Sequence, residues 1–421
     1  MLEEIQKRPF ARPLFWLIMG ILLQVCFPLQ HLSWLLLIVV AATVLISLCF
    51  ANRQPDGSYQ YRWVWGVLMA FLILFVAIQA TELAEQRRAL PPSSSWLQEK
   101  AKQAQTEMIG RLDELRLPDE TKAVLAAITI NYTKTMTRET RSRFSATGVA
   151  HLFSVGGFHV GIVCAFLGLL FAVFPKRSLF HWIKFLLTIS LLWAFTFLAG
   201  LSNPAVRAAL MFTIYLTGQM LKQQPERYNT LAATAFCMLV YKPFFLFDIG
   251  FQLSFSAVFF ILYLQPRLYR LIELRNPIFK SLWGVLTVTV AAQTGIVFLS
   301  CLYFGECSTV FLFTNLFLSL LSTLLIPLTL VWMIVPSGIP GLEILQWIIE
   351  VLSRGMMEIV YRFSMIPGAT LSLRFDFITS LSAYCILGLL LYYFRTKQTR
   401  LLLSALLLVL FLLCRQIFFM V

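Results

Sequence analysis

Residues 148–163 read Gly-Val-Ala-His-Leu-Phe-Ser-Val-Gly-Gly-Phe-His-Val-Gly-Ile-Val, and this stretch decides the fold. Two histidines and a glycine pair open an apolar run that directly follows a long polar segment. A histidine in hydrocarbon is costly, and glycines there let another helix or a substrate approach the backbone closely. The combination indicates a functional membrane span rather than the core of a soluble domain.

The composition of the whole chain supports this interpretation. Of the 421 residues, 59% are hydrophobic and 13% are charged, whereas a soluble domain is about a quarter charged. Long apolar runs recur, and the alternation typical of a membrane barrel is absent from the sequence. We therefore expect an all-α, polytopic membrane protein with about twelve transmembrane helices, the first of them a retained span rather than a signal peptide.

The distribution of basic residues predicts an orientation. The chain has 34 basic and 20 acidic residues, which gives a net charge of +14. This excess either attracts a polyanion such as DNA or reflects the preference of cytoplasmic loops for lysine and arginine. Lys7, Arg8 and Arg12 precede the first span, and residues 267–280 form the richest basic loop. One orientation, with the N-terminus in the cytoplasm, satisfies the positive-inside rule at these positions.

The chain is expected to divide into four regions. They are a three-span region (1–80), an external or interfacial amphipathic helical segment (81–147), a core of spans (148–335) and the C-terminal spans (336–421). The second span is expected over Trp34–Phe50, and the first span of the core is expected from His151 to Phe174. Within the second region we predict helices over Trp96–Leu115, with Ser95 as a cap, and from Pro118 to Ile130. Ile344–Phe363 carries charges and is either a span that faces the bundle or a helix that lies on the membrane.

Polar residues inside apolar runs are the candidate functional residues. Asn203 is placed to cap a helix that begins with Pro204. Arg207 then lies about one turn inside, where it either faces an anionic ligand or reaches lipid phosphate. Asp248 either caps the next helix or shares one polar face with Gln252 and Ser256, four and eight residues further on. Single amides such as Asn315 more often join two helices than line a passage.

These polar residues and the glycines near the histidines define a hypothetical water-accessible path for a polar chain. Its candidate lining residues are His151, Gly156, Gly157, His159, Gly161, Asn203, Arg207, Asp248, Gln252, Ser256 and Asn315.

Catalysis and metal binding are not expected. His151 and His159 would lie about 80° apart around a helix, and four histidines in the chain leave little for a metal site with Asp248. Ser154 lacks the elbow motif and an identifiable base. We therefore expect no catalytic residue, no metal and no cofactor. Among eight cysteines, Cys301 and Cys307 are the candidates for a disulfide.

Three ordered motifs resemble the ComEC-type competence proteins, the inner-membrane channels for DNA uptake. The first is the stretch quoted above, in which Gly156 replaces the usual serine and Phe158 the usual leucine. The second runs from Ser202 to Met211 and includes Arg207-Ala208, and the third is residues 247–255, Phe-Asp-Ile-Gly-Phe-Gln-Leu-Ser-Phe. Asn131 stands where the family has a glycine turn, and asparagine tolerates the left-handed conformation that such a turn requires.

The resemblance implies transport of single-stranded DNA across the bacterial cytoplasmic membrane into the cytoplasm, without enzymatic activity. The partners that it implies are single-stranded DNA, membrane lipids, a DNA-receptor protein, a cytoplasmic translocase ATPase and a second copy of the chain. Full-length relatives also carry an oligonucleotide-fold domain and a metallo-β-lactamase-like nuclease, and this sequence has neither pattern. A membrane scaffold, a small-solute transporter and a fragment of a longer protein therefore stay open as alternatives.

Overall fold

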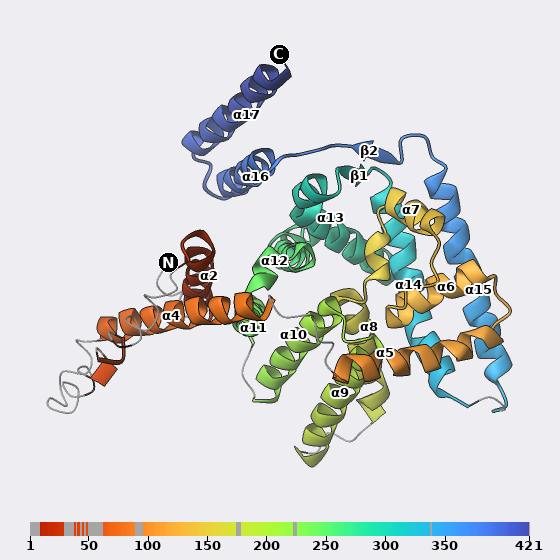
Figure 1. Cartoon of the computed structure of the whole chain (residues 1–421). Coiled ribbons are helices and arrows are strands. Elements are labelled where there is room, and N and C mark those ends of the chain that lie inside the picture. Colours follow the sequence, from red (N-terminus) through yellow and green to blue (C-terminus); the bar gives the residue numbers. More distant parts are fainter. Residues whose placement is uncertain are drawn as a thin grey trace. The chain divides into compact units, whose positions relative to one another are not determined.

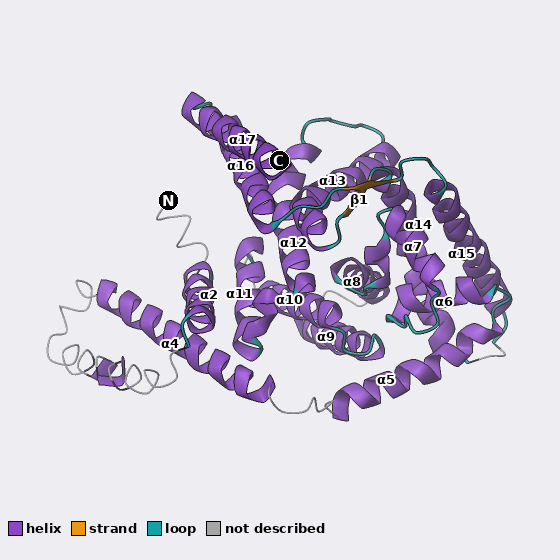
Figure 2. Ribbon diagram, turned by 45° about the horizontal axis from the view of Figure 1, so that its top comes forward, coloured by secondary structure: helices purple, strands orange, loops and turns teal. Residues whose placement is uncertain are grey.

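The computed structural model describes residues 9–28, part of 38–48, 62–88, 96–173, 178–221, 225–336 and 339–420. Nearly all of these residues lie in helices (Figures 1 and 2). The helices are α2 (Ala11–Cys26), α4 (Arg62–Arg88), α5 (Trp96–Ile109), α6 (Asp119–Ile130), α7 (Arg138–Ala146), α8 (Gly157–Leu170), α9 (Ser178–Leu198), α10 (Asn203–Met220), α11 (Arg227–Tyr241), α12 (Ile249–Tyr269), α13 (Pro277–Tyr303), α14 (Phe311–Ile334), α15 (Leu342–Ser364), α16 (Phe377–Thr396) and α17 (Thr399–Met420). The strands β1 (Glu306–Ser308) and β2 (Thr370–Ser372) pair with each other.

Six helices in the described part of the chain are long and apolar enough to cross a membrane. They lie in α4 (Gly66–Arg88), α9 (Phe180–Leu198), α12, α13, α14 and α16, and shorter apolar helices cover Ala11–Cys26 and Gly157–Val173. The predicted all-α, multi-pass class is confirmed. The charged helix α15 is not one of the six, and the predicted span Trp34–Phe50 lies largely outside the described residues.

Two predicted helix starts were wrong. The span expected from His151 begins at Gly157, because a short 3₁₀ turn over Ala150–Phe153 and an extended Gly156 precede α8. Asn203 is the first residue of α10 rather than its cap, because Ser202 adopts the extended conformation that a cap requires. Local sequence signals seldom fix a helix boundary to one residue.

Two local predictions were confirmed. The helix expected from Pro118 to Ile130 is α6, with Pro118 as its cap. Asn131 ends α6 in the left-handed conformation at φ 62°. Its side-chain oxygen accepts a hydrogen bond from the Val155 backbone amide at 3.4 Å, so this turn also holds the segment that leads into α8.

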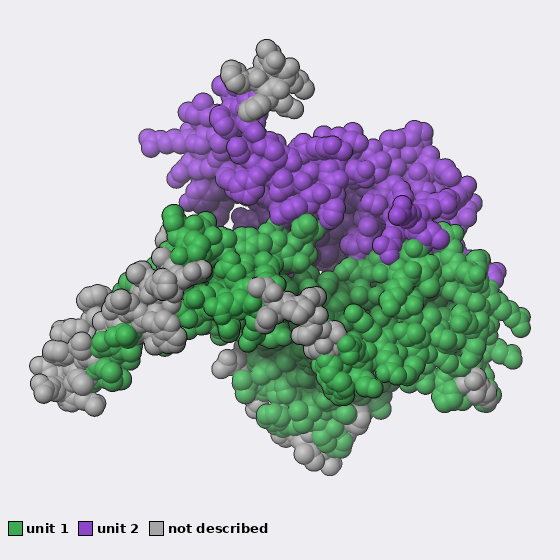
Figure 3. All heavy atoms as spheres, in the orientation of Figure 1, with its two compact units in different colours: residues 1–136, 152–255, 322–353 green, residues 137–151, 256–321, 354–421 purple. Residues whose placement is uncertain are grey.

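The chain forms two compact units, shown in different colours in Figure 3. The first contains residues 1–136, 152–255 and 322–353, and the second contains residues 137–151, 256–321 and 354–421. Candidate residues occur in both units.

The core of the first unit is built where α2, α4, α11 and α12 meet. Its buried members are Leu17, Ile21, Ala77, Ala235, Met238, Leu239 and Phe251. Gly20 allows α2 to approach α4 closely, because a Cβ atom there would lie 2.6 Å from the Cβ atom of Ala77. Small residues at such crossings let two backbones pack in contact within a membrane. This core fixes Phe251, and with it the first turn of α12, which the candidate Asp248 precedes and caps.

Helix α6 is also part of this unit and is buried on every side. All residues from Ala123 to Ile130 are buried, as expected for a helix that is apolar around its whole circumference. The side-chain amide of Gln105 on α5 donates to the Ile130 carbonyl at 2.5 Å. This bond satisfies one of the carbonyl groups that the end of α6 leaves without a helical partner.

In the second unit, a carbonyl of α13 joins two other helices. The Gly295 carbonyl accepts hydrogen bonds from Ser256 Oγ of α12 at 2.5 Å and from Tyr384 Oη of α16 at 2.7 Å. A Cβ atom at Gly295 would lie 2.9 Å from the Phe260 side chain. The absence of a side chain at this position therefore permits the close crossing of α12 and α13.

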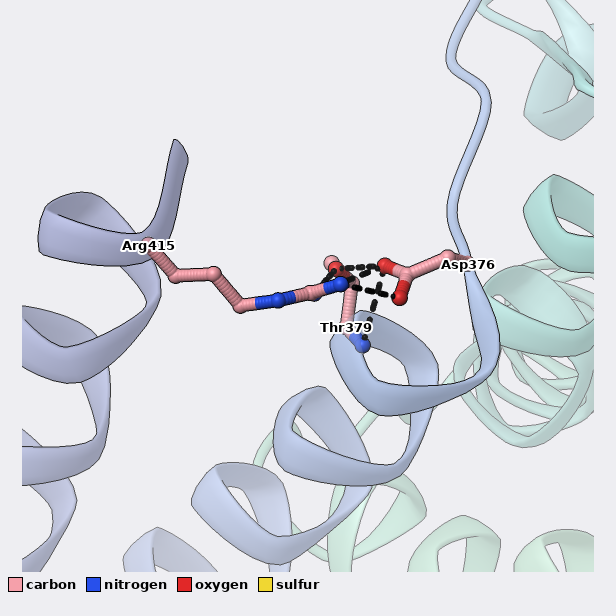
Figure 4. A network of polar contacts seen from close by, with 3 residues as sticks. All are labelled: Asp376, Thr379 and Arg415. Atoms are coloured by element: carbon pink, nitrogen blue, oxygen red, sulfur yellow. Dashed lines mark hydrogen bonds and ion pairs between the residues drawn. The ribbon is translucent and has the colours of Figure 1, made fainter. Parts of the chain in front are cut away.

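Helices α16 and α17 form an antiparallel pair that is closed at its free ends by an ion pair (Figure 4). Two nitrogens of Arg415, Nη2 and Nη1, lie 2.6 Å and 3.0 Å from the two carboxylate oxygens of Asp376. Asp376 also caps α16 by accepting from the Thr379 backbone amide. The hydrogen bonds from Arg415, and then those from Thr379, hold the pKa of the Asp376 carboxyl well below its usual range.

This geometry predicts an acid-sensitive contribution to stability. Because the pKa of Asp376 is lower in the folded chain, folding is favoured while the carboxylate is ionised, and the contribution is lost as the pH falls below the ordinary value of 3.8. The Asp376→Asn variant should unfold at a lower temperature than the wild type at pH 6. The difference should narrow progressively as the pH is lowered from about 4.

The matched control for this prediction is Glu358→Gln. Glu358 pairs with Arg362 on α15, but both side chains are largely exposed, and such pairs contribute about 0–1 kcal/mol. Thermal unfolding in detergent and hydrogen exchange of the α17 amides measure both variants. Equal behaviour of Asp376→Asn and Glu358→Gln at pH 6 would show that the Asp376–Arg415 contact does not hold α17.

Candidate functional site

Arg207 lies inside the first unit, one turn from the start of α10. Pro204 occupies the first turn of this helix, where its missing amide hydrogen is not needed and its fixed φ suits a helix. Arg207 is 2% exposed. Its Nη2 atom donates to the Gly250 carbonyl at 3.0 Å, and its Nη1 atom lies 3.8 Å from Asp248 Oδ1. The structure therefore brings two predicted candidates, Arg207 and Asp248, together from two different helices.

Asp248 connects this arginine to the start of α12. Its Oδ1 atom accepts a hydrogen bond from the Phe251 amide at 2.8 Å, which is the geometry of a helix cap. The capping interpretation is therefore confirmed, and the same oxygen also faces Arg207. The Asp248 side chain is 41% exposed, whereas that of Arg207 is 3% exposed. The Asp248 carboxylate therefore lies between the buried Arg207 guanidinium and the surface of the unit.

Gly250 makes room for this arrangement. A Cβ atom at this position would lie 3.2 Å from Asp248 Oδ1 and 3.6 Å from Arg207 Nη2. A side chain here would crowd both charged groups. The motif residue Gly250 was not among the predicted lining residues, although its spacing of two after Asp248 was visible in the sequence.

The guanidinium of Arg207 keeps unused donors. In the described part of the chain, its Nε and Nη1 atoms make no hydrogen bond. Buried charged groups are normally paired and fully hydrogen-bonded, and a contact of 3.8 Å is longer than a charge-assisted hydrogen bond. The arrangement can therefore donate two further hydrogen bonds to an anionic acceptor.

The other candidates near this pair have different surroundings. Gln252 donates from Nε2 to the Leu246 carbonyl at 3.0 Å, which ties the short 3₁₀ turn Pro243–Phe247 to α12. Asn203 is exposed at the start of α10. Ser256 bonds to Gly295 within the second unit, as described above. Gln252 and Ser256 thus each donate to a backbone carbonyl.

The glycines of α8 differ in the space around them. Gly156 lies beside Pro204, with 3.8 Å between its Cβ position and the proline Cβ, and Gly161 lies 3.4 Å from the Phe212 ring by the same measure. These two glycines support the packing of α8 against α10. Gly157 has nothing within 4 Å of its Cβ position and is exposed. His159 is buried on the same helix, at 1% exposure.

The remaining candidates, His151 and Asn315, come together in the second unit. The His151 side chain makes hydrogen bonds with the Gly148 backbone and with the Asn315 side chain. Asn315 Nδ2 in turn donates to Thr289 Oγ1 at 2.8 Å. Asn315 therefore joins α13 and α14, as a single amide in an apolar helix was expected to do. No sequence signal distinguished Thr289 from the other threonines of α13.

Gly148 supports this second group through its backbone. It adopts φ +75°, which favours glycine, and its Cβ position lies 2.6 Å from Phe311 Cβ and 2.8 Å from Ser308 Cβ. Gly148 and Ser308, which are far apart in the sequence, therefore pack closely together within the second unit.

Among the described residues, no group of three or more His, Cys, Asp and Glu side chains could hold a metal ion. A cavity of about 320 Å³ in the second unit is lined mainly by the turn between α12 and α13, including Tyr269, Glu273 and Trp283. It contains none of the candidate residues.

Comparison with known proteins places this geometry in a family context. A family model described as "Competence protein" matches residues 128–397, which is more than half of the chain. The ComE operon protein 3 of Bacillus subtilis (strain 168) is 28% identical over 179 residues, a match that covers 42% of this chain and 22% of that protein. The chain therefore matches about a fifth of the length of this curated relative. No solved structure matches the chain.

Proposed function

The chain belongs to the competence protein family, and we propose that it forms a channel through which single-stranded DNA enters the cytoplasm. Family membership and the apolar helices establish a multi-pass protein of the inner membrane with a role related to competence. We propose in addition that the N-terminus lies in the cytoplasm and that the channel works with protein partners.

The observation that carries the proposal is the partly satisfied Arg207 beside Asp248. A buried arginine in a membrane protein marks an ion or substrate pathway more often than a packing site. The phosphodiester of a nucleic acid carries its negative charge on two non-bridging oxygen atoms, and such an oxygen can accept a hydrogen bond from the unpaired Nε or from the unpaired Nη1 of Arg207. Arginine is well suited to this contact because its planar group presents donors in a fixed arrangement.

The long distance between Asp248 and Arg207 affects how easily a phosphate can bind to Arg207 and leave it again. The carboxylate stays within reach of Arg207 at 3.8 Å without a direct hydrogen bond. A phosphate that approaches Arg207 therefore displaces a weak interaction rather than a bidentate ion pair. Weak, repeated contacts of this kind suit conduction, because each site must also release the strand.

The proposal extends to partners. The sequence has no P-loop, so we assign the pulling force to a cytoplasmic translocase ATPase. A DNA-receptor protein would deliver the strand on the outer side. A second copy of the chain would complete the channel if the helices of one chain leave too narrow a passage. Crosslinking in native membranes, followed by mass measurement of the products, tests for this second copy, for the translocase ATPase and for the DNA-receptor protein.

The exposed glycine of α8 gives a steric test of the passage. Gly157→Trp should lower the uptake of labelled single-stranded DNA at least tenfold, because the indole would fill space that is open in the wild type. Gly157→Ala should retain uptake, since one methyl group meets nothing within 4 Å. Recovery of labelled DNA in the cytoplasm of transformed cells measures both variants.

Gly168 provides the matched control for this series. It lies on the same helix, and a Cβ atom there also meets nothing within 4 Å, but it is not one of the candidate lining residues. Gly168→Trp should therefore leave uptake close to the wild-type level. Uptake by Gly157→Trp equal to that by Gly168→Trp would contradict a passage along this end of α8 and would favour a scaffold or a transporter of a small solute.

A further inference from the structure

A sharp turn after α13 brings two cysteines together in the second unit. Cys301 lies in the last turn of α13 and is 1% exposed, and Cys307 is the central residue of β1 and is half-buried. Between them, Gly305 adopts φ +69°, which reverses the chain. The two thiols are both free in this structure, and their side chains are neighbours that interact with each other.

The backbone around both cysteines is fixed by one neighbouring segment. Cys307 is the partner of Leu371 in the β1–β2 ladder. The Leu373 amide donates to the Gly305 carbonyl at 3.0 Å, and the Phe375 amide donates to the Cys301 carbonyl at 3.3 Å. Residues 371–375 thus hold both ends of the turn. A disulfide requires the two Cα atoms to lie within about 7 Å of each other, and a short turn that is held on both sides allows such an approach.

We propose that Cys301 and Cys307 are a redox pair that forms a disulfide by exchange with an external disulfide, either a small molecule or an oxidoreductase. The half-buried Cys307 loses its proton to water, and its thiolate attacks one sulfur of the oxidant. The other sulfur of the oxidant leaves as a thiolate, and a mixed disulfide results. Cys301 then loses its proton and attacks Cys307 Sγ, which expels the second thiolate. Two protein thiols are oxidised and one external disulfide is reduced.

The surroundings assign different roles to the two cysteines. The Cys307 Sγ atom lies 4.0 Å from the side-chain amide of Gln293 and is partly accessible, so it is the thiol that an external reagent reaches first. Cys301 is too deeply buried to meet a bulky reagent, and its available partner is the neighbouring Cys307. Burial raises the pKa of the Cys307 thiol, so the first exchange step is slow near neutral pH.

The bond would change the mechanics of this unit. It would close a ring over residues 301–307 and fasten β1 to the end of α13 covalently. Strand β1 would then be held in place by the disulfide to α13 as well as by its hydrogen bonds with β2. Amides of β1 and β2 should exchange with solvent more slowly in the oxidised protein than in the reduced protein.

The experiment uses the purified full chain in detergent micelles, first reduced and then incubated with oxidised glutathione. Remaining thiols are alkylated under denaturing conditions, and peptide mass spectrometry identifies each of the eight cysteines. We expect Cys301 and Cys307 to escape alkylation together and their shared peptide to be two hydrogens lighter. Reduction with dithiothreitol should restore both thiols.

Single substitutions test the order of attack. In Cys301→Ser, Cys307 should retain one glutathione as a stable mixed disulfide, because the resolving thiol is missing. In Cys307→Ser, Cys301 should stay unmodified. Wild-type protein that carries glutathione on Cys307 without an internal bond would overturn the proposal, as would alkylation of both cysteines after prolonged oxidation. A dithiol peptide added to the same reaction serves as the control for the activity of the oxidant.

Discussion

Replacing Arg207 with glutamine should reduce uptake of labelled single-stranded DNA into the cytoplasm by about 10–100-fold. A hydrogen bond to a charged group contributes about 1.5–3 kcal/mol, and glutamine keeps a donor but loses the charge and the planar fork. The Arg207 side chain is buried beside Asp248. Water therefore has little access to replace the hydrogen bonds that the guanidinium would lose. Uptake measured at matched protein levels in the membrane gives the result.

Three variants separate this effect from misfolding. Arg207→Lys keeps the charge and should retain an intermediate level of uptake, because an ammonium group cannot reproduce the paired donors. Arg270→Gln makes the same change at an exposed arginine that follows α12 and should leave uptake unchanged. Asp248→Asn keeps a good capping residue but removes the counter-charge of a buried cation, so it should be less stable than Arg207→Gln. Full uptake by a folded Arg207→Gln protein would end the proposed role of this residue.

Gly148→Ala should lower the free energy of unfolding by about 2–5 kcal/mol. The left-handed conformation costs a residue with a Cβ atom about 1–2 kcal/mol, and an added group in a packed region costs about 1–3 kcal/mol more. Both conditions hold at Gly148, which has φ +75° and a Cβ position 2.6 Å from Phe311 Cβ. Thermal and urea unfolding in detergent, followed by circular dichroism, measure the loss.

The control for this prediction is Gly168→Ala. Gly168 is helical and has free space around it, so alanine there should be neutral or slightly stabilising. Similar unfolding of the two variants would show that neither the positive φ of Gly148 nor its close approach to Phe311 requires a glycine. Because Gly148 also bonds through its backbone to His151, the Gly148→Ala variant should in addition weaken the contact of His151 with Asn315.

Features that depend on neighbours in the sequence were predictable. The helix from Asp119 to Ile130, the left-handed Asn131 and the cap at Asp248 follow from residue types at fixed short spacings. The composition was sufficient for the multi-pass helical class, because hydrocarbon imposes a length and an apolarity on every span.

Features that depend on distant residues were not predictable. The strands β1 and β2 have three residues each, too few to show an alternating pattern, and their partners lie far apart in the chain. The acceptors of Ser256 and Gln252 are backbone carbonyls, which any residue provides, so no residue type marks them. The short turn before α8 also carries no signal that separates it from the helix that follows.

The candidate site shows the same division. Arg207 and Asp248 were recognised from their residue types in apolar surroundings, but their contact depends on where the start of α12 lies relative to α10. The unused donors of Arg207 and the empty space beside Gly157 are properties of packing. Thr289 and Gly250 were missed because a threonine in an apolar helix is common and because the glycine was read as part of a motif rather than as a spacer between two charges.

The pairing of β1 with β2 has a consequence for biosynthesis. About sixty residues separate the two strands, so β1 leaves the ribosome several seconds before its partner at bacterial elongation rates of about 5–20 residues per second. During this interval Cys307 lacks the strand with which it pairs in the folded chain. The β1–β2 ladder can form only after α14 and α15 have been synthesised, because both helices lie between the two strands in the chain. Formation of the ladder therefore marks the completion of this part of the nascent chain.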